Sequence, residues 1–442
     1  MDFALNEEQS RWQNEARHFA KEVLLPASLK RDQIEGGREP WDWDIIKAGS
    51  KIGFRTFAVP KDLGGIGADF VTQAIVMAEL AKGDSAMSKA FSQNWKWSHL
   101  IAEFCTKDQK DRFLKPFLAD DTYVIGSAST EPNSGSDNRY PPDDVTSGFR
   151  VKAERKGDEW ILNGEKTFIA NGSVGKLFFV NSRSDTSVVA REGTTVFMVP
   201  LGTPGFRIGK VFNKAGWRFY QNAELIFENA RVPHANVVGE PHKGQKVRSG
   251  VAAEFSDFEL AANALGICDA AVENAMQYAK KETRAGKKLY DHQLVQLNIH
   301  EMHMLTEALR SYVLRTAWER EQATRFGVEM IEMKVWRDDL TFEFDAPLYV
   351  SIDLDGIDVL RALDQRQCHV GARPRSDDQD IVQRIADGPL VRALEDEPGL
   401  GAACPKLLFA PRFVEVGLDS ATSRAPGDSR DLGVRLSGVE LD

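Results

Sequence analysis

The sequence predicts an α+β multidomain protein: a helical N-terminal domain, a β domain, a helical bundle that is incomplete or divergent, and an irregular tail. Three observations predict this order. Apolar residues recur at helical spacing over 1–121, alternate with polar residues over 122–240, and return to helical spacing over 241–322. Residues 323–442 break into short, proline-rich runs, so the fold of this last segment is left open.

The sequence also marks where helices begin and end. Asn6 and Gln9 have the spacing of a capping box, and an apolar stripe follows them as far as Pro26, where we expect the first helix to end. A second helix, over about 41–52, should stop at Gly53. Further helices are expected at about 70–84, 86–105, 108–121, 250–286 and 291–322.

The alternating region predicts an antiparallel β-barrel or sandwich. Its segments 156-KGD-158 and 163-NGE-165 have the composition of hairpin turns. Further strands are expected at 176–183, 194–200 and 223–232.

Composition narrows the class of protein. The chain is 42% hydrophobic and 28% charged, and no apolar run has the length of a membrane span. A net charge of −10 argues against nucleic acid as the main partner, whereas a phosphate-bearing small ligand needs only a local cluster of donors. Since the N-terminus lacks a signal-peptide core and the four cysteines are scattered, we expect a cytoplasmic protein with reduced thiols.

Two short segments of the β region are candidates for ligand binding. The loop 130-TEPNSGSDN-138 is too polar to pack a core, and by composition it is either an ordinary turn or a groove lined with hydroxyls and backbone N–H groups. Such a groove suits a heteroaromatic ring with a phosphate nearby. The segment 166-KTFIANG-172 places Phe168 and Ala170 on one face of a strand, where an aromatic ring could flank a flat ligand.

With these motifs the chain, from residue 1 to about 320, resembles the acyl-CoA dehydrogenase family. A T-E-P-x-x-G-S-D loop followed about 30 residues later by N-G-x-K-x-F-I-x-N-G is a specific combination. Other matching segments, in the family's order, are 57-FAVPKDLGGIGAD-69, 78-AELAKGD-84, 106-TKDQKDRFLKPFLADD-121, 203-TPGFRIG-209, 227-FENARVPHANVVG-239 and 286-GKKLYDHQ-293. The resemblance implies that FAD lies between the β domain and the C-terminal bundle.

The resemblance implies a role for each matching residue. Ser127, Ser129 and Thr130 stand where the family holds the flavin ring, and Phe168 stands where an aromatic packs against it. Ala170 takes the place of a Thr or Ser near flavin N5, so only its backbone N–H can donate there.

Substrate and diphosphate residues are also implied. Ser136 matches a residue near the CoA pyrophosphate or pantetheine, and Arg218 lies in a loop that the family places near the flavin site. The family completes the FAD diphosphate site across a subunit interface, which implies a homo-dimer or tetramer. Among the residues that the family contributes to this diphosphate site from the second subunit, Gln293 is present. The position of the family's arginine holds Glu282, and Arg284, two residues later, could substitute for it.

The implied reaction is α,β-dehydrogenation of an acyl-CoA thioester. A carboxylate removes the α-proton, the β-hydrogen leaves as hydride to FAD, and an electron-transfer flavoprotein or similar acceptor takes the electrons. The family's usual Tyr-Glu-Gly-Thr base segment is absent from the sequence. Some relatives carry the base on the first helix of the C-terminal bundle, where the matching position is Ser256; Glu259, about one turn later, is the candidate base.

Other interpretations stay open. Glu282 and Ala170 would also suit a catalytically silent partner subunit or damaged paralogue, and the same fold could serve a flavin-dependent oxidase or monooxygenase. The stretch 325–358 resembles part of the arginase/agmatinase family, in which Asp353 and Asp355 match two manganese ligands. Its partner motifs are absent from the sequence, so we predict no metal site.

Overall fold

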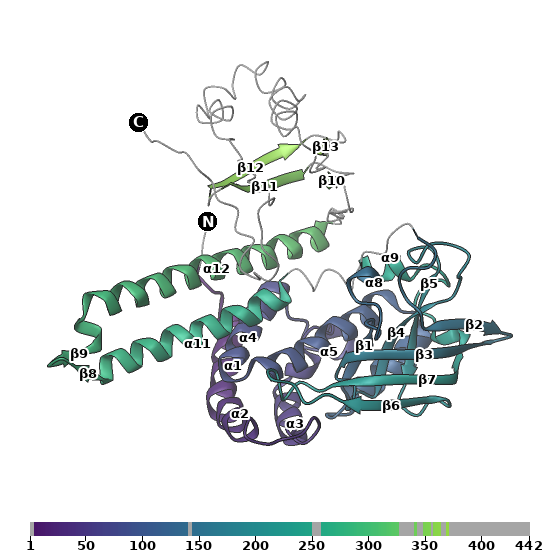
Figure 1. Cartoon of the computed structure of the whole chain (residues 1–442), viewed down its shortest axis with the longest axis horizontal. Helices are drawn as coiled ribbons and strands as arrows, with labels where there is room; N and C mark the ends of the chain where they lie inside the picture. Colours follow the sequence, from purple (N-terminus) through teal and green to yellow (C-terminus); the bar gives the residue numbers. More distant parts are fainter. Residues whose placement is uncertain are drawn as a thin grey trace, which may run out of the picture. The chain divides into compact units, whose positions relative to one another are not determined.

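The structure is a computed structural model that describes residues 4–139, 144–249 and 258–326, together with four strands between residues 340 and 370 (Figure 1). The chain divides into two compact units, Met1–Met330 and Ile331–Asp442.

The first part of unit 1 is helical. Its helices are α1 (Glu7–Phe19), α2 (Leu25–Arg31), α3 (Trp43–Ile52), α4 (Phe70–Gly83), α5 (Ser85–Phe104), α6 (Lys107–Gln109) and α7 (Lys115–Ala119). Short 3-10 turns lie at Phe54–Thr56 and Lys61–Leu63, and π-helical turns at Ala20–Leu24 and Lys110–Leu114. Both bonds of the predicted capping box at Asn6 form, and Gly53, at φ 108°, ends α3 as predicted.

One helix end was predicted wrongly. The first helix does not end at Pro26, because the chain passes through the π-helical turn Ala20–Leu24 and continues as α2. Pro26 lies in the first turn of α2. Proline is tolerated there, since its ring meets no preceding α-helical carbonyl and its missing N–H removes no α-helical bond.

The middle of unit 1 is a seven-stranded sheet in the order β1-β4-β2-β3-β7-β6, with β5 paired to β4 and β1 paired also to β3. The β1–β4 and β2–β4 pairs are parallel, so the prediction of a purely antiparallel domain is wrong. Its strands are β1 (Ile125–Ala128), β2 (Lys152–Lys156), β3 (Glu159–Ala170), β4 (Leu177–Arg183), β5 (Thr194–Pro200), β6 (Phe206–Val211) and β7 (Asn222–Pro233). The helix α8 (Ser136–Arg139) follows β1, and a 3-10 turn (His234–Asn236) follows β7.

The two predicted hairpin turns have different outcomes. Lys156 pairs with Glu159, so 156-KGD-158 makes the predicted turn. Residues 163-NGE-165 instead lie inside β3, where the register with β7 shifts and Gly164 has φ 132°. A glycine within a strand is typical of such a bulge, and this explains the wrong prediction.

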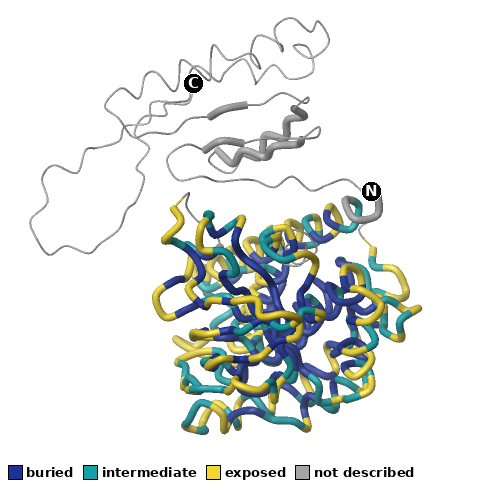
Figure 2. The backbone as a smooth tube through the Cα atoms, turned by 90° about the vertical axis from the view of Figure 1, so that its right-hand side faces the viewer, coloured by how far each residue is buried: buried dark blue, intermediate teal, exposed yellow. Residues whose placement is uncertain are grey.

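The sheet lies between two cores. On one side aromatic rings from the helices meet it, and Trp97 of α5 stacks on Phe179 of β4 with ring centroids 4.8 Å apart. On the other side the strands enclose a core of their own that includes Trp160, Phe197 and Phe227. Figure 2 shows the buried backbone gathered inside unit 1 and the exposed backbone around it.

Two long helices form the C-terminal part of unit 1, α11 (Glu259–Lys281) and α12 (Gln293–Phe326), preceded by α9 (Gly244–Ser249). A two-stranded hairpin, β8 (Thr283–Arg284) with β9 (Lys287–Lys288), and the 3-10 turn Leu289–Asp291 connect them. Gly266 allows α11 to approach α4 closely, because a Cβ added there would lie 2.1 Å from the carbonyl oxygen of Ala78.

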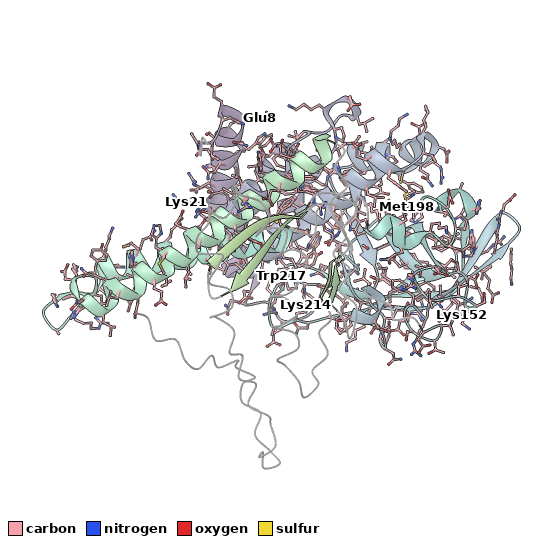
Figure 3. All side chains as sticks on the ribbon, turned by 90° about the horizontal axis from the view of Figure 1, so that it is seen from above. Glu8, Lys21, Lys152, Met198, Lys214 and Trp217 are labelled. Carbon is pink, nitrogen blue, oxygen red and sulfur yellow. The ribbon has the colours of Figure 1, made fainter. Side chains whose placement is uncertain are left out.

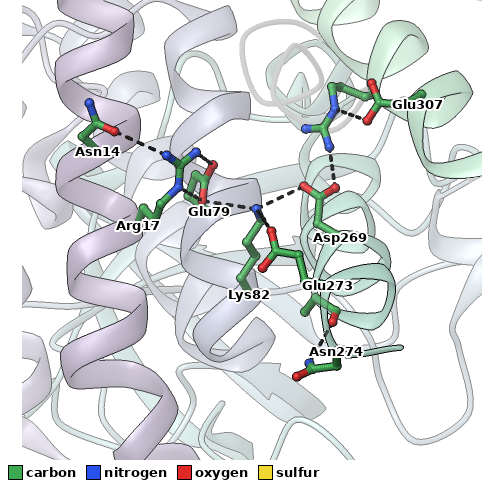
Figure 4. Close-up of polar contacts among 10 residues, drawn as sticks. Asn14, Arg17, Glu79, Lys82, Asp269, Glu273, Asn274 and Glu307 are labelled. Atoms are coloured by element: carbon green, nitrogen blue, oxygen red, sulfur yellow. Dashed lines mark hydrogen bonds and ion pairs between the residues drawn. The ribbon is translucent and has the colours of Figure 1, made fainter. Parts of the chain in front are cut away.

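A chain of ion pairs holds α1, α4, α11 and α12 together (Figure 4). Arg17 pairs with Glu79 at 2.7 Å, and Lys82 reaches Glu79, Asp269 and Glu273 at 3.5, 3.6 and 2.9 Å. Arg310 of α12 completes this series of ion pairs by pairing with Asp269. Glu79 and Asp269 are buried, so these charges are screened less than surface pairs.

Helix α12 exposes several large apolar side chains among polar ones. They include Leu294, Leu297, Leu305 and Tyr312. Val313 and Ala317, by contrast, are buried against the helices of unit 1. None of the described helices is long and apolar enough to cross a membrane.

In unit 2 the described strands are β10 (Leu340–Phe342), β11 (Leu348–Leu354), β12 (Ile357–Leu363) and β13 (Cys368–Val370). β11 and β12 pair as an antiparallel hairpin in which Leu354 faces Ile357. Asp353 lies at the end of β11, while Asp355 lies outside the described residues.

Candidate functional site

The sheet brings the two predicted ligand-binding segments together. Ser127 of β1 is the register partner of Ala170 of β3, and the backbone N–H of Thr167 donates to the carbonyl of Thr130 at 2.9 Å. We call the surface formed by Ser127, Ser129, Thr130, Phe168 and Ala170 the shelf. The three hydroxyls of the shelf are half-buried and bond to no side chain or backbone group that the structure describes. They therefore remain available to a ligand.

A buried ion pair locks the polar loop to β3. Lys166 Nζ lies 2.7 Å from Glu131 Oε1 and donates to the Ser129 carbonyl at 3.0 Å. Glu131 also accepts from the backbone N–H groups of Arg150 and Val151, at 2.6 and 3.1 Å. Burying two charges is unfavourable unless both are well bonded, and here both are. The pair thus fixes the loop rather than contacting a ligand itself.

The rest of the polar loop is organised by its own side chains. Ser134 Oγ bonds with Asp137 and Asn138, both at 2.7 Å, and the N–H of Gly135 donates to Asp137. Ser136 begins α8 and is exposed.

Phe168 is presented in an unusual way. Its backbone has φ 56°, its side chain is 57% exposed, and its ring centroid lies 4.4 Å from that of Phe212. A bulky residue rarely adopts positive φ unless its surroundings enforce it. An exposed aromatic ring on the same surface as three free hydroxyls is what a planar heterocycle needs, so the shelf fits a flavin ring.

Two buried side chains beside the shelf have unused polar atoms. Asn171 donates to the Ile125 carbonyl but leaves Oδ1 unpaired, and Gln221 accepts from Ser173 but leaves Nε2 unpaired, within the part of the chain that the structure describes. Unpaired buried polar atoms are rare and call for a partner. Asn171 directly follows Ala170 of β3, and Gln221 directly precedes Asn222 of β7. Ala170 and Asn222 are register partners in the sheet.

Glu259, the candidate base, is 4% exposed at the start of α11. Lys89 Nζ of α5 lies 2.5 Å from its Oε1, and Ser92 Oγ donates to the same oxygen at 2.6 Å. Burial alone would raise the pKa of Glu259, but the charges of Lys89 and Lys96 and the bonds from Lys89 and Ser92 outweigh burial and lower this pKa. The carboxylate is therefore ionised.

Helix α5 connects Glu259 to the shelf. One face of α5 bonds to Glu259 through Ser92, while Asn94 Oδ1 accepts from the Ile125 N–H of β1 at 2.8 Å. Between them, Gln93 accepts from the hydroxyl of Tyr220 at 2.8 Å. Burial raises the pKa of Tyr220 and the charge of Glu259 raises it further, which places the two side chains in one electrostatic neighbourhood.

Arg218 bonds to the backbone of a neighbouring loop. Its guanidinium donates to the carbonyl oxygens of Asp32 and Ile34, so it holds the 215–220 loop to the end of α2. It also lines a cavity of about 80 Å³ at the start of α5, together with Arg31 and Asp84. The structure does not bring Arg218 together with Ser136.

Arg284 and Gln293 lie at the other end of α11 from Glu259. The 23 residues of α11 span about 35 Å, and both side chains are exposed on the connection to α12. Ala285 and Gly286 make its tight turn, with φ of 49° and 78°. In one chain these two residues therefore do not reach the shelf.

Sequence reasoning missed several residues that organise the site. Glu131 and Lys166 both lie in quoted motifs, and the opposite charges that these two motifs carry were the available signal. Lys89 and Asn94 gave no local signal, because their partners lie far away along the chain.

The chain matches three parts of one family. Residues 6–121 match the acyl-CoA dehydrogenase N-terminal domain, 126–230 the middle domain, and 254–344 the C-terminal domain. The last match extends into the stretch 325–358, and what the comparisons show there is the acyl-CoA dehydrogenase family.

Individual relatives agree with this assignment. A probable acyl-CoA dehydrogenase of Bacillus subtilis is 30% identical over 77% of this chain and 86% of its own length. A short-chain-specific acyl-CoA dehydrogenase of Megasphaera elsdenii is 31% identical over 74% of this chain and 83% of its own length.

Solved structures agree as well. The butyryl-CoA dehydrogenase of Megasphaera elsdenii superimposes with a TM-score of 0.67, at 30% identity, over 73% of this chain and 82% of that chain. A chain described as an electron transferring flavoprotein of Acidaminococcus fermentans gives a TM-score of 0.67 at 32% identity, over 73% and 81%. The chain belongs to the acyl-CoA dehydrogenase family.

Proposed function

We propose that this protein is an FAD-dependent oxidoreductase that removes the α- and β-hydrogens of an acyl-CoA thioester. The observation that carries the proposal is the shelf, in which three free hydroxyls and an exposed aromatic ring lie on paired strands. Membership in the family supports the same reaction. FAD, when bound, supplies the acceptor for the hydride.

The residues of the shelf would orient the flavin ring. The hydroxyls of Ser127, Ser129 and Thr130 offer donors and acceptors to the polar edge of the ring, and Phe168 covers one part of it. At Ala170 only the backbone N–H can donate toward the ring, because the side chain is a methyl group. Ser136, exposed on α8, would contact the CoA moiety.

Glu259 would remove the α-proton. Its ionised state suits a base, but the bonds from Lys89 and Ser92 lower its proton affinity. General bases work best when their pKa approaches the working pH. We therefore expect proton abstraction to require that Lys89 move away from Glu259 when the substrate is bound.

A second copy of the chain would complete the diphosphate site. Arg284 and Gln293 are exposed and distant from the shelf of their own chain, and both match or neighbour family positions that act across a subunit interface. The proposed assembly is a homo-dimer or tetramer, and an electron-transfer flavoprotein or similar acceptor would reoxidise it.

The visible spectrum of the purified protein, with and without added FAD, tests the proposal. Bands near the usual flavin positions should bleach when a panel of acyl-CoA thioesters is added without oxygen, and an artificial electron acceptor should restore them. A protein that never acquires the flavin spectrum would refute flavin binding. A yellow protein that no acyl-CoA bleaches would refute the dehydrogenase activity.

The ion pair at Glu259 favours one alternative, a catalytically silent partner subunit. Such a protein would bind FAD and CoA thioesters without bleaching. Oxygen consumption without an added acceptor would instead indicate a flavin-dependent oxidase or monooxygenase.

A further inference from the structure

The segment of β3 that carries the shelf is bulged. Lys166 pairs with Leu225 and Ile169 with Ala223, so three steps along β3 match two steps along β7. Phe168, inside this bulge, has φ 56° and points its ring outward. Bulges beside functional sites redirect a side chain, and this conformation needs support from the surroundings because it is strained.

A polar bridge from the neighbouring loop supplies that support. Asn222 Nδ2 donates to the Phe168 carbonyl at 2.6 Å. Lys214 Nζ in turn donates to Asn222 Oδ1, and to the Tyr220 carbonyl at 2.7 Å. Because Lys214 offers only donors, it fixes the Asn222 amide with its oxygen toward Lys214 and its nitrogen toward Phe168. Figure 3 labels Lys214 together with Trp217 of the same loop.

Lys214 has no acidic partner in the described part of the chain, which sets it apart from Lys166 and Lys89. Its ammonium lies 5.3 Å from the Tyr220 ring centroid, and burial lowers the pKa of Lys214 to about 8. The other charged groups of this loop and the neighbouring strands have their own contacts. Lys210 lies over the Phe212 ring, Glu224 accepts from the Lys210 N–H, and Arg218 bonds to the carbonyls of the 32–34 loop.

We propose that Lys214 is a positioning residue that holds the bulge of β3, through Asn222, in the conformation that presents Phe168 and Ala170 to the flavin ring. This inference rests on the proposed function, since the flavin is the ligand proposed there. Lys214 can donate to Asn222 whether its amine is charged or neutral. Because burial lowers the pKa of Lys214, the buried site favours the neutral amine, so the support should not weaken as pH rises through about 8.

The first test measures FAD affinity at pH 7 and at pH 9.5, by quenching of FAD fluorescence, in the full chain and three variants. The wild type should bind FAD no more weakly at pH 9.5 than at pH 7. K214M should bind about fivefold to tenfold more weakly than the wild type at both pH values, as expected for the loss of one hydrogen bond. K214R keeps its hydrogen-bond donors and should bind more tightly than K214M. K210M, which removes a nearby exposed lysine, should follow the wild type.

The second test needs no flavin. Hydrogen exchange of the FAD-free protein at pH 7 should be faster in residues 166–172 of K214M than of the wild type, and unchanged in 177–183 and in K210M. Unchanged exchange in 166–172 of a folded K214M, or wild-type FAD affinity in K214M, overturns the inference. If the wild type binds no FAD at all, the proposed function fails, while the exchange measurement still decides whether Lys214 supports the bulge. If K214M does not fold, N222A, which removes the amide between Lys214 and Phe168, replaces it in both measurements with the same expected results.

Discussion

Three lysines around the site have different surroundings, and these determine what each can do. Lys166 is bonded to Glu131 inside the β domain, Lys89 neutralises Glu259 between two helices, and Lys214 has only neutral partners. A paired buried charge holds structure in place, whereas an unpaired one titrates within the physiological range. The sequence singled out Glu259 as the candidate base but gave no sign of its partner, because Lys89 lies on a distant helix and belongs to no motif.

The first prediction concerns the charge state of Glu259. Replacing Lys89 with methionine removes the largest influence that lowers the pKa of Glu259 and leaves burial to raise it. Since the base must be ionised, the acidic limb of the pH profile of kcat/KM should move to higher pH by about 1–3 units. K96M, which removes a second and more distant charge, should shift the limb less in the same direction. An unmoved limb in K89M would exclude Glu259 as the base.

The second prediction concerns the pair that holds the polar loop. E131Q leaves Lys166 as a buried charge without a counterion, and it should lower the free energy of unfolding by about 3–5 kcal/mol in urea titrations. E159Q breaks the exposed pair with Arg231 and should change this free energy by less than about 1 kcal/mol. Equal effects of the two substitutions would contradict the structural role given to Glu131.

For individual helices and strands, sequence-based prediction succeeded where the structure depends on neighbouring residues. It failed where the structure depends on contacts between distant segments. The capping box at Asn6, the stop at Gly53 and the 156–158 turn depend on neighbouring residues, and all three were predicted correctly. The parallel pairing of β1 with β4 joins segments about fifty residues apart, and no local pattern encodes such a register. The continuation of the helix past Pro26 depends on a π-helical turn, which leaves no mark in the periodicity.

The third prediction tests the close contact of α4 and α11. Alanine normally stabilises a helix relative to glycine, yet at Gly266 its methyl group would collide with the Ala78 carbonyl. G266A should therefore lower the free energy of unfolding by about 1–3 kcal/mol. At Gly216 an added Cβ meets nothing within 4 Å, so G216A should leave it unchanged within about 0.5 kcal/mol. Thermal or urea unfolding of both variants distinguishes the two sites, and a stabilised G266A would contradict the close approach.

For the whole molecule, a single chain leaves apolar side chains exposed on α12. It also leaves the proposed diphosphate residues far from the shelf that would hold the flavin ring. Leu294, Leu297, Leu305 and Tyr312 lie exposed on α12, and Arg284 lies on the turn that precedes it. The family and the order of its domains could be predicted from motifs and periodicity. The exposed face of α12 could not, because helical spacing shows that a helix has an apolar stripe but not what covers it.

The fourth prediction links assembly to the cofactor. Replacing Leu305 and Tyr312 with glutamate should lower the mass of the particle in sedimentation velocity experiments and weaken FAD binding at least tenfold. Charged residues cannot be buried unpaired in an interface, and a separated chain lacks the second copy's Arg284. L201E, which changes an exposed leucine between β5 and β6, serves as the control and should alter neither property. Intact FAD binding by dissociated chains would show that one chain suffices.

Helix α5 contacts β1, the strand that carries Ser127 of the shelf, through Asn94, and it contacts the candidate base through Ser92, so one helix carries contacts toward both halves of the reaction. A ligand that fixes the position of α5 from one side will change the free energy of binding on the other. By reciprocity, FAD and an acyl-CoA should then raise each other's affinity by the same factor, and a mutation on α5 that touches neither ligand should alter that factor.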